Sequence, residues 1–182
     1  MRTDANFPRD ELRELAGAPG VVAIGEVGFD DSGPDWGVQT AAFDAQCQLA
    51  RGFGHALVLH IDGAAAWSLL EERADALSGL RVVRHYFTGD EAQATWHREL
   101  GHFLSFGNPL RRSPALQAIA ATYPPDLLLI ETDTYPLPGR TTEPKDVVKV
   151  GQHLAEVRGW ELEQTQERLE ENTMSAFSRY FS

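Results

Sequence analysis

Four residues of this 182-residue chain combine metal-binding side chains with positions at or near the carboxyl ends of short apolar segments: Glu26, His60, His85 and Asp133. Two imidazoles and two carboxylates are suitable ligands for a divalent ion such as Zn, Mn or Mg. A bound ion of this kind lowers the pKa of a water ligand and polarises a scissile bond. The chemistry that these residue types favour is therefore hydrolysis.

Each of these residues, taken alone, has an ordinary structural explanation. Glu26 is equally compatible with hydrogen bonds from backbone amides or an arginine, and a histidine at a strand end is commonly a structural residue. Asp133 also suits an Asx-turn after a strand. Because four of the five predicted strands end in this way, we favour one shared site over four coincidences.

The apolar segments and the stretches between them predict the elements that position these residues. Strands are expected over 21–29, 55–61, 81–87, 102–107 and 127–133. Helices are expected over 38–53, 64–76, 90–100, 113–122, 145–158, 162–171 and 173–181. Their alternation is typical of α/β proteins with a parallel sheet whose strands are buried on both faces. The carboxyl ends of parallel strands lie at one edge, so we expect the four side chains to converge there.

Composition excludes some classes of function and site. A net charge of −11 disfavours a large basic groove for nucleic acid, although a bound cation would still admit a phosphate. The only cysteine, Cys47, is expected in the core and cannot form an internal disulfide or a cysteine zinc cluster. No apolar run is long enough to cross a bilayer, and MRTDANFPRDELRE lacks the apolar core of a signal peptide. We therefore expect a cytoplasmic protein outside the membrane.

The order of the motifs resembles the TatD family of metal-dependent hydrolases, which are deoxyribonucleases with an amidohydrolase-like TIM barrel. AIGEVGFD is similar to the family's A-I-G-E-I-G-L-D, RHYFTGD to H-C-F-S-G, and LLLIETDTYPL to L-L-L-E-T-D-S-P-Y-L. The helix that contains Gln39 and Phe43, with the strand that follows, is similar to Q-x-x-x-F-x-x-Q-L-x-L-A and V-x-x-H-x-R.

The resemblance implies one or two divalent ions (Zn, Mn or Mg) per chain, held by Glu26, His60, His85 and Asp133. In this interpretation Glu26 bridges the metals and Asp133 is also the general base. The implied reaction is hydrolysis of a phosphodiester, such as DNA.

The departures from the family are specific. The chain has neither the H-x-H strand nor the G-x-H-P strand end of the family, and Asp62 stands where the family has an arginine. A TIM barrel takes about 250 residues and eight strands. The resemblance therefore implies a single TatD-like domain over residues 1–182 in which a partial barrel lacks its first three strands.

Three hypotheses follow. The first is a metal-dependent hydrolase. The second is a catalytically impaired remnant that oligomerises or is completed by a partner chain, because an open sheet exposes the edge strands 21–29 and 127–133. The third is a structural module whose polar strand ends are caps. The remaining histidines are expected outside the site, with His97 and His153 exposed on helices and Trp36 in the loop after the first strand.

Overall fold

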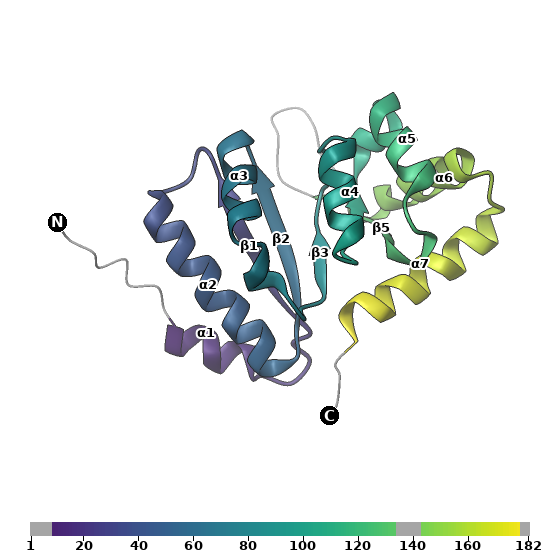
Figure 1. Ribbon diagram of the computed structural model, residues 1–182. Helices are drawn as coiled ribbons and strands as arrows, with labels where there is room; N and C mark the ends of the chain where they lie inside the picture. Colours follow the sequence, from purple (N-terminus) through teal and green to yellow (C-terminus); the bar gives the residue numbers. More distant parts are fainter. Residues whose placement is uncertain (1–8, 134–142, 179–182) are drawn as a thin grey trace. The chain divides into compact units, whose positions relative to one another are not determined.

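The computed structural model describes residues 9–133 and 143–178. Strands and helices alternate along the chain, as the apolar segments predict (Figure 1). The elements in order are α1 (Arg9–Ala16), β1 (Ala23–Asp30), α2 (Trp36–Phe53), β2 (Ala56–Asp62), α3 (Ala64–Glu72), η1 (Ala74–Leu77), β3 (Val82–Arg84), α4 (Glu91–Glu99), β4 (Phe103–Phe106), η2 (Asn108–Arg111), α5 (Pro114–Thr122), η3 (Pro125–Leu127), β5 (Leu128–Ile130), η4 (Pro144–Asp146), α6 (Val147–Arg158) and α7 (Leu162–Phe177).

The chain forms two compact units, and each is described by itself. Unit 1 comprises residues Met1–Val82 and Phe177–Ser182, and unit 2 comprises Val83–Ala176, so the boundary falls within β3. In both units, neighbours in the sheet are neighbours in the sequence. That the whole chain is one domain stays a prediction.

Unit 1 is built on the parallel pair β1 and β2. The register runs from Ala23 opposite Ala56 to Asp30 opposite Asp62. Helices α2 and α3 pack against β1, and α2 runs alongside the two strands in Figure 1. Phe29 of β1 and Phe43 of α2 are both buried, with ring centroids 4.7 Å apart. These contacts fix the side of β1 that faces the core.

Unit 2 contains the parallel strands β3, β4 and β5. Val83 lies opposite Phe103, and Leu104 lies opposite Leu128. The core of this unit is a cluster of aromatic and aliphatic side chains that comprises Phe87, Ala94, Leu104, Phe106, Leu110, Leu116, Ile119, Ala120, Tyr123, Leu128, Val150, Leu154 and Leu169. This packed core therefore supports the carboxyl ends of β3 and β5.

Several local signals read from the sequence act as expected. The Ser113 hydroxyl accepts a hydrogen bond from the Leu116 amide at 3.3 Å, with Pro114 in the first turn of α5. Gly159 adopts a left-handed conformation, with φ of 64°, directly after α6. The sequence therefore predicts the helix start and the helix end for the right physical reasons.

The expectation of two separate helices over 162–171 and 173–181 is wrong over the described residues, because α7 continues from Leu162 to Phe177. The Asn172 side chain is buried and donates to the carbonyl oxygens of Pro125 and Leu128, both at 2.8 Å. An asparagine with tertiary acceptors has no need to cap a helix, so the helix runs through it. Residues 179–181 lie outside the described range.

The helix α1 was not predicted from the sequence. Residues 134–142, between β5 and η4, lie outside the described residues. Within the described part of the chain, no helix is both long enough and apolar enough to span a bilayer.

Candidate metal centre

Glu26 lies in a β-bulge of β1. Ile24 pairs with Leu57 and Val27 with Leu59, so β1 has one residue more than β2 between these pairs. A bulge bends the strand and redirects a side chain. Glu26 is exposed, with 56% of its side chain accessible. The expectation of a strand buried on both faces is therefore wrong for β1, and the Glu26 carboxylate keeps its contact with water.

The structure brings Glu26 together with His60, the second predicted ligand. His60 Nδ1 lies 3.5 Å from Glu26 Oε2, and 34% of the His60 side chain is exposed. His60 is opposite Gly28 in the register, and Gly28 has φ of 155°. A Cβ atom at position 28 would overlap the His60 carbonyl oxygen. Only glycine allows β1 to approach His60 this closely.

Asp30 lies on the other side of the His60 ring. Its Oδ2 atom is 4.0 Å from His60 Nε2, while its Oδ1 atom accepts from the Ser32 amide and hydroxyl, both at 2.6 Å. The Ser32 hydroxyl and amide hold the pKa of the Asp30 carboxyl below its usual range, and His60 adds a smaller effect in the same direction. Asp30 was not predicted as a site residue, although it belongs to the same AIGEVGFD motif as Glu26.

In unit 2, His85 directly follows β3 and has a carboxylate partner of its own. His85 Nδ1 lies 3.2 Å from Glu131 Oε1, and only 10% of the His85 side chain is exposed. The Glu131 amide donates to the Phe106 carbonyl oxygen at 3.0 Å, which fixes Glu131 just beyond the end of β5. Sequence reasoning missed Glu131; its signal is the ETD triplet that also contains Asp133.

Asp133 lies three residues beyond the end of β5, in a left-handed backbone conformation with φ of 37°. Aspartate tolerates this conformation better than most residues. Tyr86, directly after His85, also has a positive φ of 44°, which is costly for an aromatic residue. Its ring packs over Gly107, where a Cβ atom would lie 2.5 Å from Tyr86 Cε2. Such strain often accompanies functional sites.

Comparisons with known proteins identify the family of the chain. The family model described as TatD related DNase matches residues 2–178. This chain belongs to the TatD family.

Relatives of this TatD-family chain are named as hydrolases and exonucleases. The chain is 31% identical over 179 residues to the "uncharacterized metal-dependent hydrolase YabD" of Bacillus subtilis, covering 91% of this chain and 69% of that relative. It is 37% identical over 155 residues to the "3'-5' ssDNA/RNA exonuclease TatD" of Cronobacter turicensis, covering 78% of this chain and 57% of that relative.

A solved structure shares the fold. The TatD homologue YjjV of Escherichia coli K12 matches with a TM-score of 0.82 and 26% identity, covering 95% of this chain and 71% of that one. The α/β fold with parallel strands is therefore similar to that of TatD-family TIM barrels. None of these names favours the alternative of a non-catalytic remnant.

In this TatD-family chain the donor set of unit 1 fits a divalent ion. An imidazole nitrogen and a carboxylate oxygen 3.5 Å apart are suitable neighbouring ligands, and both residues belong to a group of potential metal ligands. Because both side chains remain accessible, an ion can reach them from solvent. The prediction of a metal site with histidine and carboxylate ligands is supported at this level.

The histidines excluded from the site are structural, but one expectation about them is wrong. His97 is completely buried, where exposure was expected, and its Nδ1 lies 3.0 Å from Nδ1 of the buried His102. Burial is the main cause that lowers the pKa of His97 to about 2 and the pKa of His102 to about 4. The inward face of α4 carries His97 into the core of unit 2, which its sequence position did not reveal.

Cys47 and Trp36 complete the comparison with the sequence-based expectations. Cys47 is buried, as predicted, and burial raises the pKa of its thiol to about 12, so it is no nucleophile. Trp36 is the first residue of α2, just after the loop in which it was expected, and 38% of it is exposed.

Proposed function

We propose that this protein is a metal-dependent phosphodiesterase that cleaves nucleic acid strands. The observation that carries the proposal is the pairing of Glu26 with His60, two potential ligands that stand where the family motifs place them. The names of the relatives supply the reaction class, and one of them is a 3'-5' ssDNA/RNA exonuclease.

We propose Glu26, His60, His85 and Asp133 as the ligands of one or two ions of Zn, Mn or Mg, as the resemblance implies. The bound ion would supply Lewis acidity at the scissile phosphate. Asp133, which is partly exposed three residues beyond the end of β5, would take the proton of the attacking water. Glu131 would orient His85 through its 3.2 Å contact.

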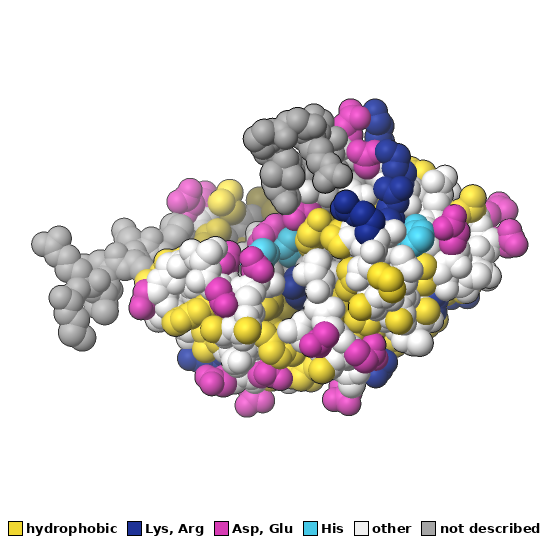
Figure 2. Space-filling view, turned by 90° about the horizontal axis from the view of Figure 1, so that it is seen from above, with side chains coloured by type: hydrophobic (Ala, Val, Ile, Leu, Met, Phe, Trp, Pro, Cys, Tyr) yellow, Lys and Arg dark blue, Asp and Glu magenta, His cyan; other side chains and the backbone are white. Residues whose placement is uncertain are grey.

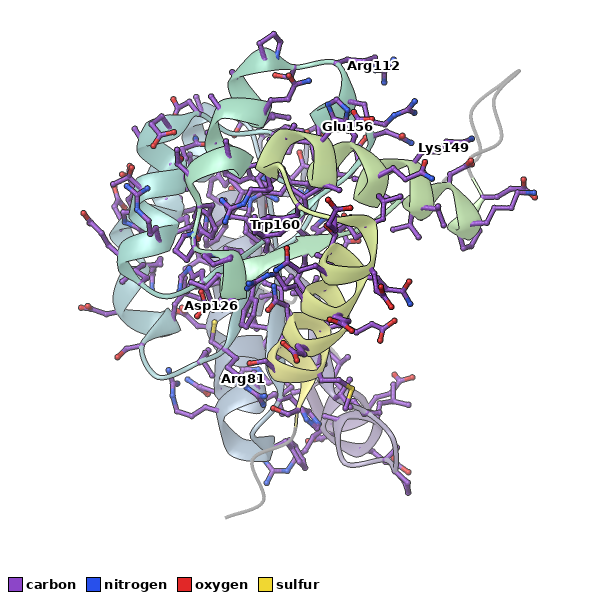
Figure 3. All side chains as sticks on the ribbon, turned by 90° about the vertical axis from the view of Figure 1, so that its right-hand side faces the viewer. Arg81, Arg112, Asp126, Lys149, Glu156 and Trp160 are labelled. Carbon is purple, nitrogen blue, oxygen red and sulfur yellow. The ribbon has the colours of Figure 1, made fainter. Side chains whose placement is uncertain are left out.

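A local cluster of positive charge supports a phosphate-bearing substrate despite the net charge of −11. Arg111 and Arg112 are exposed where η2 follows the carboxyl end of β4, and no ion pair involves either of them among the described residues. Lys and Arg side chains gather on one face of unit 2 in Figure 2, and Figure 3 shows Arg112 and Lys149 on the same side. Lys149 itself is paired with Asp146 at 2.6 Å. The two arginines are therefore our candidates for contacts with strand phosphates.

We propose that the five strands correspond to the last five strands of the family barrel. A second copy or a partner chain beside the edge strands stays a prediction, as does a location in the cytoplasm.

Unit 2 also contains a groove of about 830 Å³, lined by apolar residues that include Ile130, Leu162 and Met174. None of the predicted ligands lines this groove.

The proposed function is tested by hydrolysis. The purified chain would be assayed with Mn, Zn or Mg on bis(p-nitrophenyl) phosphate and on a labelled single-stranded oligonucleotide. Asp133→Asn is expected to lower kcat on both substrates by about 100-fold or more. Glu99→Gln, which removes an exposed carboxylate of α4, is the matched control and should leave kcat unchanged. A metal-loaded chain that hydrolyses neither substrate would contradict the proposal.

A further inference from the structure

The His60 ring has a carboxylate on each side. Glu26 Oε2 faces Nδ1 at 3.5 Å, and Asp30 Oδ2 faces Nε2 at 4.0 Å. A neutral imidazole has one nitrogen with a lone pair and one that carries a proton. Only the nitrogen with the lone pair can bind a metal, so the two flanking carboxylates have different roles.

We propose that Asp30 is a positioning residue that holds His60 in the tautomer protonated on Nε2, so that Nδ1 is the metal-binding atom. The proposal rests on the metal-dependent function proposed above, because Glu26 is taken as a ligand of the same ion. The nitrogen that faces Glu26 then binds the ion, and the nitrogen that faces Asp30 carries the proton. Metal-bound histidines commonly donate their second N–H to a carboxylate, which fixes the ring orientation.

Asp30 is held in a way that suits this role. Its two oxygens have separate partners, because Oδ1 accepts both hydrogen bonds from Ser32 and Oδ2 faces His60. Its backbone is clamped by the buried Gln39, whose Oε1 accepts from the Asp30 amide at 2.9 Å and whose Nε2 donates to the Asp30 carbonyl oxygen at 3.0 Å. The direction of the carboxylate is therefore fixed independently of His60.

The distance of 4.0 Å between Nε2 and Oδ2 is an ion-pair distance and exceeds that of a hydrogen bond. A movement of about 1 Å brings the two atoms to hydrogen-bond length. Both side chains are about one-third exposed, so the ring has room to make this movement when Nδ1 binds an ion. Contacts of this kind commonly tighten only in the loaded site.

Asp30→Asn tests the assignment with an isosteric change. The amide oxygen of asparagine can keep both bonds from Ser32, which leaves the amide NH2 to face His60 Nε2. A donor at that position favours the tautomer protonated on Nδ1, and that tautomer cannot bind a metal through Nδ1. The affinity for Zn or Mn, measured by calorimetry, is expected to fall roughly 10- to 100-fold.

Asp31→Asn is the matched control. Asp31 is the neighbouring carboxylate, and its Oδ1 accepts from the Ala66 amide at 2.8 Å, a bond that asparagine can keep. The Asp31→Asn variant removes a negative charge one residue away from Asp30. If Asp30 acts on the tautomer, the metal affinity of Asp31→Asn should stay within about twofold of that of the wild type. The melting temperature of Asp31→Asn should match that of the wild type, and that of Asp30→Asn should be slightly lower because a neutral amide accepts the two Ser32 bonds more weakly, so affinities are measured well below both melting temperatures.

A second readout needs neither metal nor hydrolysis. Long-range ¹⁵N NMR of the metal-free chain at alkaline pH reports the tautomer of His60, assigned by the signal that is lost in His60→Gln. Glu26 is the nearer carboxylate and competes for the proton through Nδ1, so the tautomers are compared in a Glu26→Ala background. In that background we expect the Nε2–H tautomer with Asp30 intact and in Asp31→Asn, and a shift toward the Nδ1–H tautomer in Asp30→Asn. An Nδ1–H tautomer with Asp30 intact in that background, or an Asp30→Asn variant with unchanged tautomer and metal affinity, would overturn the proposal even if the enzyme hydrolyses phosphodiesters. A chain that shows the expected tautomers but no hydrolysis would instead count against the proposed function alone.

Discussion

The two predicted histidine ligands are held in contrasting ways. In unit 2, His85 is nearly buried, has a carboxylate partner at 3.2 Å, and precedes a strained Tyr86 that packs over Gly107. In unit 1, His60 is one-third exposed and lies between two carboxylates at 3.5 and 4.0 Å. Packing therefore positions His85 before any ion binds, whereas polar groups and a close backbone approach position His60.

Gly28→Ala removes the close backbone approach that positions His60. The added Cβ would overlap the His60 carbonyl oxygen, so β1 and β2 must separate at that point. We expect a loss of about 3–4 kcal/mol in the free energy of unfolding, measured by urea denaturation. Gly52→Ala is the control, because nothing lies within 4 Å of its Cβ position in α2, and it should stabilise the chain by roughly 0.5–1 kcal/mol. Equal effects of the two variants would refute the close approach at His60.

Acid should affect the two units in different pH ranges. His102 titrates near 6.5 when unfolded but only near 4 when folded, so the unfolded chain binds the extra proton between these values. The contribution of His102 to stability is therefore complete above pH 6.5 and is lost as the pH drops to 4, by about 3 kcal/mol, and His97 adds a loss of the same sign. The lowered pKa of Asp30 in unit 1 acts with the same sign but in a more acid range, because it contributes stability above the ordinary value of 3.8 that is lost at lower pH.

Urea denaturation at pH 7.5, 5.5 and 4.5 measures the effect of His102. The variant His102→Gln removes one of the two titrating rings and should reduce the dependence on pH between 6.5 and 4 by about half, because His97 still titrates on unfolding, although its stability at pH 7.5 is lower. An unchanged slope in this variant would show that the buried histidine pair does not control acid stability.

The two carboxylate partners should differ when each is neutralised. Glu131→Gln, next to the nearly buried His85, is expected to cost about 1–2 kcal/mol of unfolding free energy, because the imidazole loses a charged acceptor. Glu26→Gln, at an exposed bulge, should change stability by less than about 0.5 kcal/mol. Thermal melts of both variants in metal-free buffer make the measurement. A larger loss for Glu26→Gln would reverse the contrast between the two histidines.

The smallest expected effect concerns charge at the strand ends. Unit 2 has Arg111 and Arg112 beyond β4, whereas unit 1 ends β2 with the exposed Asp62. The salt dependence of oligonucleotide binding is the slope of log K against log salt concentration. Replacing both arginines with glutamine should lower the magnitude of this slope by about 1.4, because each contact with a single-strand phosphate contributes about 0.7. Fluorescence anisotropy in calcium, which limits cleavage, measures the slope. Arg98→Gln, an arginine paired with Glu91 on α4, is the control that should leave it unchanged.

The sequence predicts the strands well because each is a short apolar run bounded by helical spacing, and Ser113 and Gly159 act locally at helix ends. It predicts Glu26 and His60 as neighbours because their strands are adjacent and parallel. It does not reveal Asp30 and Glu131 as histidine partners, because these contacts join residues far apart in the chain. Asp30 lies 30 residues before His60, and Glu131 lies 46 residues after His85. The bulge at Glu26 depends on the register with β2, and the burial of His97 depends on which face of α4 meets the core. Neither of these is encoded in local periodicity.

A metal centre built on Glu26 and His60 is tested most directly by metal binding. The wild type and His60→Gln would each be titrated with Zn or Mn and then dialysed, and the bound metal would be measured. We expect about one tightly bound ion or more per wild-type chain, and an affinity at least about 10-fold weaker in His60→Gln. Fewer than about 0.2 ions per wild-type chain, or an unchanged affinity in His60→Gln, would contradict a metal centre built on Glu26 and His60.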